Sequence, residues 1–465
     1  MKRSKIKWIL LLILVLTAGT LLMLNVIFSK EDSVLPQNLV ASESVVILVL
    51  LIILIPILLI ALMFVLAFVK SKPETIKASI NKVTLNGSNS TTVQKTPNKK
   101  EKKKLNEQRF CMLNDIERNK SKLERVNYDK NVTLDEICDD FRSYASSKLK
   151  LYYDISDIRR FIAGMAVSHI LILQGMSGTG KTSLAHAFGS FMDNPSTIIP
   201  VQPMWKERTD LIGYYNEFTR KFNETLLLEK MYEANYSKDI YITVLDEMNI
   251  ARVEYYFAEF LSLLELPNPE ERYLDVVSDK WDTDPVQLKD GRIKLPENMW
   301  FIGTANNDDS TFAISDKVYD RAMILNLDMK CERFNAPKVS KKRVSYETFN
   351  KLVKDAIEEY DISGRNKKRL ALLDSYLIEH FHITFGNRIM KQIQQYIPVY
   401  IACGGDELEA LDDILAKKVM RKLETQNPIY LRNAAEGLVS YIDELFGNDS
   451  MPRCKEFIRR LERNA

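Results

Sequence analysis

The chain has 465 residues, of which 46% are hydrophobic and 27% are charged, and its formal net charge is +3. This length predicts more than one domain and is sufficient for a sizeable core. The near balance of charge gives no global reason to expect nucleic-acid binding. Five scattered cysteines without a CxxC pair are typical of a reducing compartment.

Two long apolar runs lie near the N-terminus. Residues 8–28 and 45–69 carry no charge, and each run is long enough to cross a bilayer as a helix. Lysines and an arginine precede the first run and lysines follow the second, whereas the loop between them is mainly acidic. The positive-inside rule then places both termini in the cytosol. We therefore expect a multi-pass cell-membrane protein with a transmembrane hairpin over residues 1–77; a cleaved signal peptide is the alternative for the first run.

The rest of the chain divides by pattern. Residues 78–106 are rich in Asn, Ser, Thr and Lys, which predicts a disordered linker. Residues 107–165 have a helical pattern, in which Thr133 and Glu136 form a capping box. Over residues 166–330 short β-rich runs alternate with helical segments, which predicts an α/β core with a parallel sheet flanked by helices. Residues 331–465 are helical in pattern again.

A phosphate-binding loop is the strongest motif. The apolar run HILILQ at 169–174 is followed directly by GMSGTGKT at 175–182, which is GxxxxGK[ST] between a strand and a helix. Glycines let the loop wrap its N–H groups around phosphate oxygens. Lys181 would contact the β- and γ-phosphates, and the hydroxyl of Thr182 would contact Mg²⁺. The nucleotide-binding residues expected here are Gly175, Ser177, Gly178, Thr179, Gly180, Lys181, Thr182 and Ser183; a chance match is the alternative.

Polar residues follow two later apolar runs. Asp246 and Glu247 come directly after IYITVL at 240–245, and Asn306 follows MWFIGTA at 299–305. An aspartate beside a P-loop can join Thr182 in the Mg²⁺ shell, and the next glutamate can polarise the attacking water. Singly these residues could be an acidic turn and a turn-forming asparagine. Their order after the P-loop favours a catalytic site.

With these three strand ends in order, the chain resembles AAA+ NTPases of the dynein-related, helix-2-insert group, which includes MoxR-type ATPases, midasin and the McrB restriction GTPase. The resemblance is carried by LDEMNIARVEYYFAEFLSLLE at 245–265, FIGTANNDDS at 301–310 and SDKVYDRAMILNL at 315–327. It implies a P-loop AAA+ core followed by a C-terminal helical lid. It also implies that Asp246 is the Walker B residue, Glu247 the catalytic glutamate and Asn306 sensor 1.

The same resemblance implies two catalytic arginines. Arg321 would be the arginine finger, although McrB-like proteins often carry consecutive arginines there and this chain has Asp320 and Ala322 on either side. A local ion pair with Asp320 is therefore the alternative. Arg388 in FGNRIMKQIQQY is the best match to a sensor 2 arginine in the lid.

Two further segments match this group. WKERTDLIG at 205–213 is similar to the region of the helix-2 insert, with an ordinary surface loop as the alternative. Residues 286–295 alternate apolar and polar side chains around Asp290-Gly291, which predicts a hairpin.

The resemblance implies an ATPase that uses Mg²⁺ and acts in a homo-oligomeric ring, expected to be hexameric, to remodel or regulate an unknown partner protein. Arg321 would reach the γ-phosphate held by a neighbouring subunit. GTP stays possible, because a P-loop contacts phosphates and not the base. Two alternatives remain open: a McrB-like GTPase that meets nucleic acid only through a nuclease partner, and a nucleotide-gated membrane scaffold with little turnover.

Overall fold

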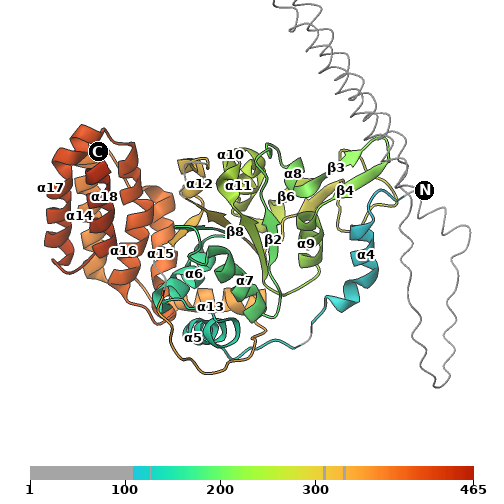
Figure 1. Cartoon of the computed structure of the whole chain (residues 1–465), viewed down its shortest axis with the longest axis horizontal. Coiled ribbons are helices and arrows are strands. Elements are labelled where there is room, and N and C mark those ends of the chain that lie inside the picture. The colour runs from blue at the N-terminus through green and yellow to red at the C-terminus, as the bar shows by residue number, and fades with distance from the viewer. Residues whose placement is uncertain (1–107, 126, 307–310, 328–330, 465) are drawn as a thin grey trace, which may run out of the picture. The chain divides into compact units, whose positions relative to one another are not determined.

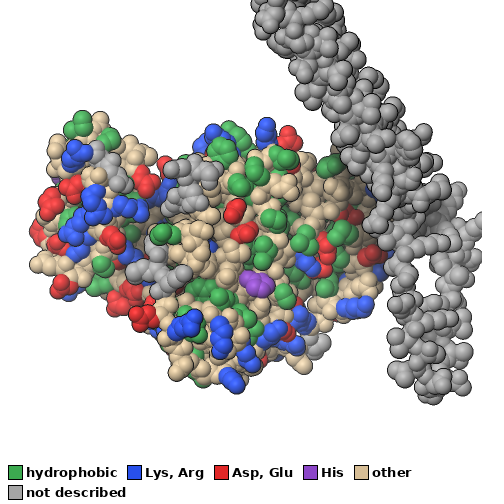
Figure 2. Space-filling model, viewed as in Figure 1, with side chains coloured by type: hydrophobic (Ala, Val, Ile, Leu, Met, Phe, Trp, Pro, Cys, Tyr) green, Lys and Arg blue, Asp and Glu red, His purple; other side chains and the backbone are tan. Residues whose placement is uncertain are grey.

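The computed structural model describes residues 108–125, 127–306, 311–327 and 331–464 (Figure 1). These residues belong to one compact unit. The predicted transmembrane hairpin and linker fall outside the described residues. On the face shown in Figure 2, acidic and basic side chains are intermixed over the C-terminal helices, in keeping with the nearly balanced charge of the chain.

The predicted membrane location must be corrected. Among the described residues, no helix is long and apolar enough to cross a membrane. The longest helices in this part of the chain, α14 (Gly364–Phe381) and α17 (Pro428–Phe446), carry charged side chains along their length, which are costly inside a bilayer. We therefore withdraw the assignment to the cell membrane with cytosolic termini.

A five-stranded parallel sheet forms the centre of the unit (Figure 1). Its strand order is β2-β5-β8-β1-β9, with β1 (Ile170–Gln174), β2 (Thr197–Pro200), β5 (Tyr241–Asp246), β8 (Met299–Ala305) and β9 (Met323–Asn326). Every residue of β1 and β8 is buried, as expected for parallel strands covered on both faces. The predicted parallel α/β core is confirmed.

The two faces of the sheet are covered by different helices. Alternate residues of β1 belong to two core clusters, Leu171 and Leu173 to one and Ile170 and Ile172 to the other. The first cluster includes α5 (Leu134–Tyr144), α6 (Ile155–Val167) and α7 (Lys181–Phe191). The second includes α4 (Met112–Asn119), α8 (Thr209–Ile212), α9 (Leu226–Ala234), α10 (Val253–Tyr256), α11 (Ala258–Leu264) and α12 (Asp316–Tyr319).

A local signal in the sequence accounts for the start of α5. Thr133 and Glu136 form the predicted capping box at the start of α5, each side chain accepting from the other residue's backbone N–H. Short helical turns other than α-helix connect the elements, at Lys120–Lys122, Ala145–Leu149, Met248–Ile250, Pro269–Glu271 and Met420–Thr425.

Two antiparallel hairpins project from the core. One joins β3 (Gly213–Asn216) to β4 (Lys221–Glu224) and directly follows α8, so the segment at 205–213 leads into it. The other joins β6 (Tyr273–Asp275) to β7 (Arg292–Lys294). The tight turn predicted at Asp290-Gly291 is present, and Lys289 and Arg292 exchange two backbone hydrogen bonds across it, at 2.9 and 3.0 Å. The pairing does not extend further back along the chain, and the partner strand of β7 is β6. Pro285 and Leu288 close a separate turn there instead.

The C-terminal region is helical, as predicted. Its helices are α13 (Tyr346–Glu359), α14, α15 (Gly386–Ala402), α16 (Glu407–Lys418), α17 and α18 (Pro452–Asn464). Their apolar residues join the same core cluster as α5, α6 and α7. Helix α15 packs against both α6 and α16 and thus connects the C-terminal helices to the sheet domain (Figure 1).

Candidate functional site

The phosphate-binding loop connects β1 to α7 and depends on glycine. Gly178 and Gly180 have φ angles of 77° and 96°, in the left-handed region that other residues adopt only with strain. The hydroxyl of Tyr153 donates to the carbonyl of Gly180 at 3.1 Å, which fixes the end of the loop. A side chain at Gly180 would meet the ring of Tyr153 within 3.5 Å.

Lys181 lies inside this loop. It is 7% exposed, and its ammonium donates to the carbonyl oxygens of Gly175 at 2.9 Å and Met176 at 2.8 Å. The hydroxyl of Thr179 also donates to Met176 O, at 3.0 Å. Ser177 is exposed and Ser183 is half-buried in the first turn of α7. The loop thus holds a cation at the N-terminus of an 11-residue helix, an arrangement suited to phosphate.

The P-loop meets the acidic strand end through one carboxylate oxygen. Oδ1 of Asp246, at the end of β5, accepts from the hydroxyl of Thr182 at 2.7 Å and from that of Thr304 at 2.8 Å. A hydroxyl and a carboxylate are oxygen ligands of the kind that Mg²⁺ prefers, and Mg²⁺ commonly uses one or two carboxylates together with substrate phosphates. Thr182 and Asp246 therefore fit a nucleotide-bound Mg²⁺.

Glu247 follows in an uncommon backbone conformation. Its φ is 53°, in the left-handed region, which is rare for a residue other than glycine and is often found at functional sites. Its N–H donates to the hydroxyl of Thr304 at 2.9 Å, and its side chain is exposed. Thr304 therefore fixes both acidic residues at once, a role that the sequence interpretation did not assign.

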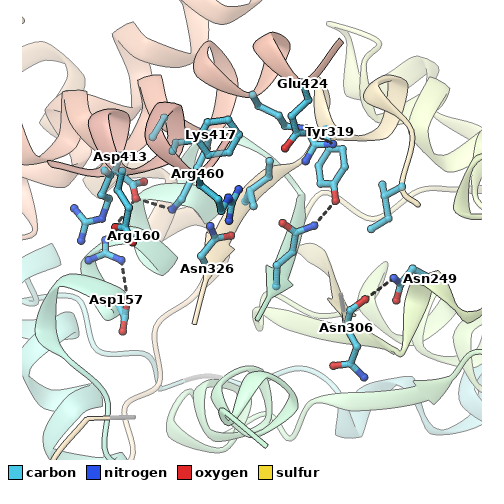
Figure 3. A pocket seen from close by; sticks show the side chains of 18 of the residues that line it. Asp157, Arg160, Asn249, Asn306, Tyr319, Asn326, Asp413, Lys417, Glu424 and Arg460 are labelled. Atoms are coloured by element: carbon cyan, nitrogen blue, oxygen red, sulfur yellow. Dashed lines mark hydrogen bonds and ion pairs between the residues drawn. The ribbon is translucent and has the colours of Figure 1, made fainter. Parts of the chain in front are cut away.

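Asn306 is fixed by a second residue that sequence reasoning missed. The side-chain amide of Asn249 donates to Asn306 O at 2.9 Å and to Phe312 O at 3.3 Å, and the N–H of Phe312 donates back to Asn249 O (Figure 3). Thr311 also donates to Asn306 O, at 3.1 Å. Asn249 thus ties the end of β8 to the turn that carries Glu247.

A cavity of about 1000 Å³ lies between these strand ends and the C-terminal helices. From the sheet domain it is lined by Gln174, Asn249, Asn306 and Tyr319, and from the C-terminal helices by Asp413, Lys417, Arg421 and Arg460 (Figure 3). The residue that directly precedes the P-loop therefore shares a cavity with cations of the C-terminal region.

One wall of this cavity holds a buried ion-pair network. Asp413 of α16 pairs with Lys417 at 2.6 Å and with Arg160 of α6 at 3.6 Å. Burial alone would raise the pKa of Asp413, but Lys417 and Arg160 hold it below its ordinary value. The network joins the sheet domain to the C-terminal helices.

The two predicted catalytic arginines, Arg321 and Arg388, are brought together by one carboxylate that belongs neither to the P-loop nor to the Asp413 network. Arg321 pairs with Glu265 at 3.0 Å, and Arg388 pairs with the other oxygen of the same carboxylate at 2.7 Å. The neighbouring residue Asp320 instead accepts from Gln392 through its carbonyl, at 3.2 Å. In the part of the chain that the structure describes, neither arginine contacts the P-loop.

Two parts of the chain match known domain families. Residues 170–322 match the AAA domain (dynein-related subfamily), and residues 338–465 match a domain of unknown function, DUF8727. The first range contains the P-loop, Asp246, Glu247, Asn306 and Arg321. The predicted AAA+ resemblance is confirmed at the level of the dynein-related class, and this implies a nucleotide-binding ATPase domain. The comparisons support neither the narrower McrB-like likeness nor the transmembrane segments.

Two solved structures are similar at low identity. A candidate ATPase from Cytophaga hutchinsonii is 16% identical, with a TM-score of 0.43, and the match covers 74% of this chain and 97% of that one. A full-length MCM homolog from Methanopyrus kandleri is 12% identical, with a TM-score of 0.33, and the match covers 60% and 58%. None of the curated proteins matches the sequence.

Proposed function

We propose that this AAA+ protein of the dynein-related class is an Mg²⁺-dependent ATPase that acts as a homo-oligomeric ring and remodels or regulates a partner protein. The observation that supports this most directly is the 2.7 Å contact between the hydroxyl of Thr182 and the carboxylate of Asp246. It joins the phosphate-binding loop to the acidic strand end, the two parts that nucleotide hydrolysis needs on one edge of a sheet.

Each residue has a distinct role in this proposal. Lys181 neutralises charge on the β- and γ-phosphates, and Thr182 and Asp246 hold Mg²⁺, which offsets the charge of the phosphates when it is bound. Glu247, with an exposed carboxylate just beyond Asp246, orients and polarises the attacking water. Asn306 directs its amide toward that water from a backbone fixed by Asn249.

The ring is proposed from the position of Arg321. Its side chain is 25% exposed and is paired with Glu265 rather than with a group of the P-loop. An arginine that acts on a γ-phosphate from such a position does so in the site of another copy, as arginine fingers supplied in trans do. Rings form when identical subunits associate head to tail with closure.

Phosphate release from ATP and from GTP by the purified protein tests the proposal. Glu247→Gln keeps the size of the side chain but removes the carboxylate, so ATP should still bind and hydrolysis should fall by roughly 100-fold or more. Glu217→Gln is the matched control, because Glu217 is an exposed glutamate at the tip of the β3–β4 hairpin. Equal hydrolysis by Glu247→Gln and the parent would contradict the proposed chemistry, and faster hydrolysis of GTP would change the assigned substrate.

A further inference from the structure

One carboxylate joins arginines from two regions of the chain. Glu265 directly follows α11 in the sheet domain, Arg321 lies between α12 and β9, and Arg388 lies in the first turn of α15. Oε2 of Glu265 is 3.0 Å from Arg321, and Oε1 is 2.7 Å from Arg388. Each oxygen thus takes one guanidinium, and the carboxylate lies between two cations that would otherwise repel each other.

Stability does not account for this arrangement. The side chains of Arg321, Glu265 and Arg388 are 25%, 30% and 52% exposed, and partly exposed ion pairs contribute little to the free energy of folding. A guanidinium carries five N–H donors, and each of these ion pairs is made through a single terminal nitrogen. Both arginines can therefore bind a further anion while they stay on Glu265.

The backbone around Arg321 is fixed by other residues. Lys418, a buried lysine of α16, donates to Tyr319 O at 2.7 Å and also to the carbonyl of Ala322. Gln392, one helical turn after Arg388 on α15, donates to Asp320 O at 3.2 Å. With the backbone held in this way, the direction of the Arg321 side chain depends on Glu265.

We propose that Glu265 is a positioning residue that holds Arg321 and Arg388 together as one anion-binding pair for the γ-phosphate bound to a neighbouring copy of the chain. The proposal rests on the proposed function. It assigns Arg388 to act beside Arg321 and not at the P-loop of its own subunit. Without the carboxylate the two cations repel, so the pair no longer meets the charge that develops on the transferred phosphoryl group.

The test is steady-state hydrolysis of ATP by the full-length protein. In Glu265→Gln, kcat should fall by about 10-fold or more while KM and the Kd for ATP change less than about threefold, because only the transition state is affected. Glu259→Gln is the matched control: Glu259 lies on α11, is 35% exposed and pairs with Arg208 at 2.8 Å. Its kcat should equal that of the parent. A parent kcat in Glu265→Gln would overturn the proposal.

A double-mutant cycle tests the coupling itself. Arg388→Ala should lower kcat about 10-fold in the parent but less than about threefold in the Glu265→Gln background, because residues that act as a unit are not additive. Equal losses in both backgrounds would mean that the two residues act independently and would overturn the proposal. The side chain of Arg388 is 52% exposed, so its replacement by alanine does not disturb the packing of the core.

Failure of the proposed ATPase function and failure of the positioning role of Glu265 give different results. A parent protein without ATP hydrolysis, or one whose hydrolysis survives Lys181→Ala, would refute the ATPase and the positioning role together. An active, Lys181-dependent parent with an equally active Glu265→Gln variant would refute the positioning role alone.

Discussion

The side-chain amide of Gln174 donates a hydrogen bond to the hydroxyl of Tyr319, and both residues line the cavity between the sheet domain and the C-terminal helices (Figure 3). Gln174 is the last residue of β1 and directly precedes the P-loop, whereas Tyr319 ends α12 two positions before Arg321. A single hydrogen bond therefore connects the strand that leads into the proposed nucleotide site with the segment that carries the arginine that we propose acts on another copy of the chain.

Tyr319→Phe removes that hydroxyl and keeps the ring, over which the guanidinium of Arg421 lies. We expect the Kd for ATP to stay within about threefold and hydrolysis to fall about 5- to 10-fold, because the amide of Gln174 loses its partner and Arg321 is less well positioned. Titration with ATP and phosphate release measure the two quantities. Tyr214→Phe, on a tyrosine that is 52% exposed in β3, is the control. Unchanged hydrolysis in Tyr319→Phe would contradict this connection.

The parts of the site that the sequence predicts are contiguous motifs. The P-loop at 175–182 and the pair Asp246-Glu247 each follow a buried apolar run, and both the motif and its strand can be read from neighbouring residues. Asn306 was predicted for the same reason. The parallel sheet followed from the alternation of such runs with helical segments, because this pattern reports local burial.

Thr304 and Asn249 show what a single sequence cannot provide. Each is an isolated polar residue, and its role arises only when the register of β5 and β8 places Leu245 opposite Gly303. The shared contact of Glu265 with Arg321 and Arg388 likewise depends on how α15 packs against the sheet domain. At Asp290-Gly291 the turn chemistry was predicted correctly, but the choice of β6 as the partner strand is a long-range effect.

Thr304→Val tests whether its hydroxyl positions both acidic residues. The substitution removes the donor to Asp246 and the acceptor of the Glu247 N–H. Hydrolysis should fall by roughly 10- to 100-fold and require more Mg²⁺, because the carboxylate that would hold the ion is no longer oriented. An Mg²⁺ titration of phosphate release measures both effects.

Thr243→Val is the matched control for this change. Thr243 lies on the neighbouring strand β5 and is 1% exposed, and among the described residues its hydroxyl has no hydrogen-bond partner. Its replacement by valine should therefore leave hydrolysis unchanged and should not reduce stability. Equal losses of activity in the two variants would assign the effect to strand packing and not to the Thr304 hydroxyl.

Arg109 should be a major contributor to stability near the two hairpins. It is 1% exposed, it pairs with Asp279 and Asp284 at 2.6 Å each, and its guanidinium lies 4.6 Å from the ring centroid of Trp281. Arg109→Met leaves Asp284, which is 5% exposed, without its cation. The free energy of unfolding should fall by about 3–5 kcal/mol in urea titrations.

A second substitution separates the two possible causes of this loss of stability, the unpaired charge of Asp284 and the lost packing of the Arg109 side chain. Adding Asp284→Asn removes the unpaired charge and should recover part of the stability. Arg118→Met is the control, because Arg118 and its partner Asp115 are 51% and 66% exposed, and a change there should stay within about 0.5 kcal/mol. A double variant as unstable as Arg109→Met would show that the charge of Asp284 is not the cause.

His169 should make the protein sensitive to mild acid. Its side chain is half-buried, its ring stacks on Trp300, and it donates to Glu297 O at 2.9 Å. Burial lowers the pKa of His169 from 6.5 to about 4. Below pH 6.5 the unfolded chain takes up a proton that the folded chain does not, so stability falls with pH until about pH 4.

The expected loss from His169 between pH 7.5 and pH 5 is about 2 kcal/mol. His169→Gln can still donate to Glu297 O but does not titrate, so its unfolding free energy should depend less on pH by that amount. His186→Gln, at an exposed histidine, should keep the pH dependence of the parent. Parallel urea titrations at the two pH values provide the measurement, and identical pH dependence in His169→Gln and the parent would contradict the prediction.

The proposed action of Arg321 in trans predicts a specific rescue between two inactive variants. Arg321→Ala should still bind ATP in its own P-loop but lose hydrolysis in the neighbouring site, and Glu247→Gln should bind ATP without hydrolysing it. In an equal mixture, about one quarter of the head-to-tail interfaces combine an intact Glu247 site with an intact Arg321 donor. Phosphate release should therefore return in part.

The matched control is a mixture of Glu247→Gln with Lys181→Ala. Both of these changes lie in the same nucleotide site, so no interface in that mixture carries a complete site and no activity should return. Because the two mixtures differ only in whether the second defect lies at Arg321 or in the P-loop, recovery in the first and not in the second identifies Arg321 as the residue supplied by the neighbour. If both mixtures stay as inactive as the single variants, Arg321 does not complete the site of another subunit, and its ion pair with Glu265 would then have to be explained within one chain.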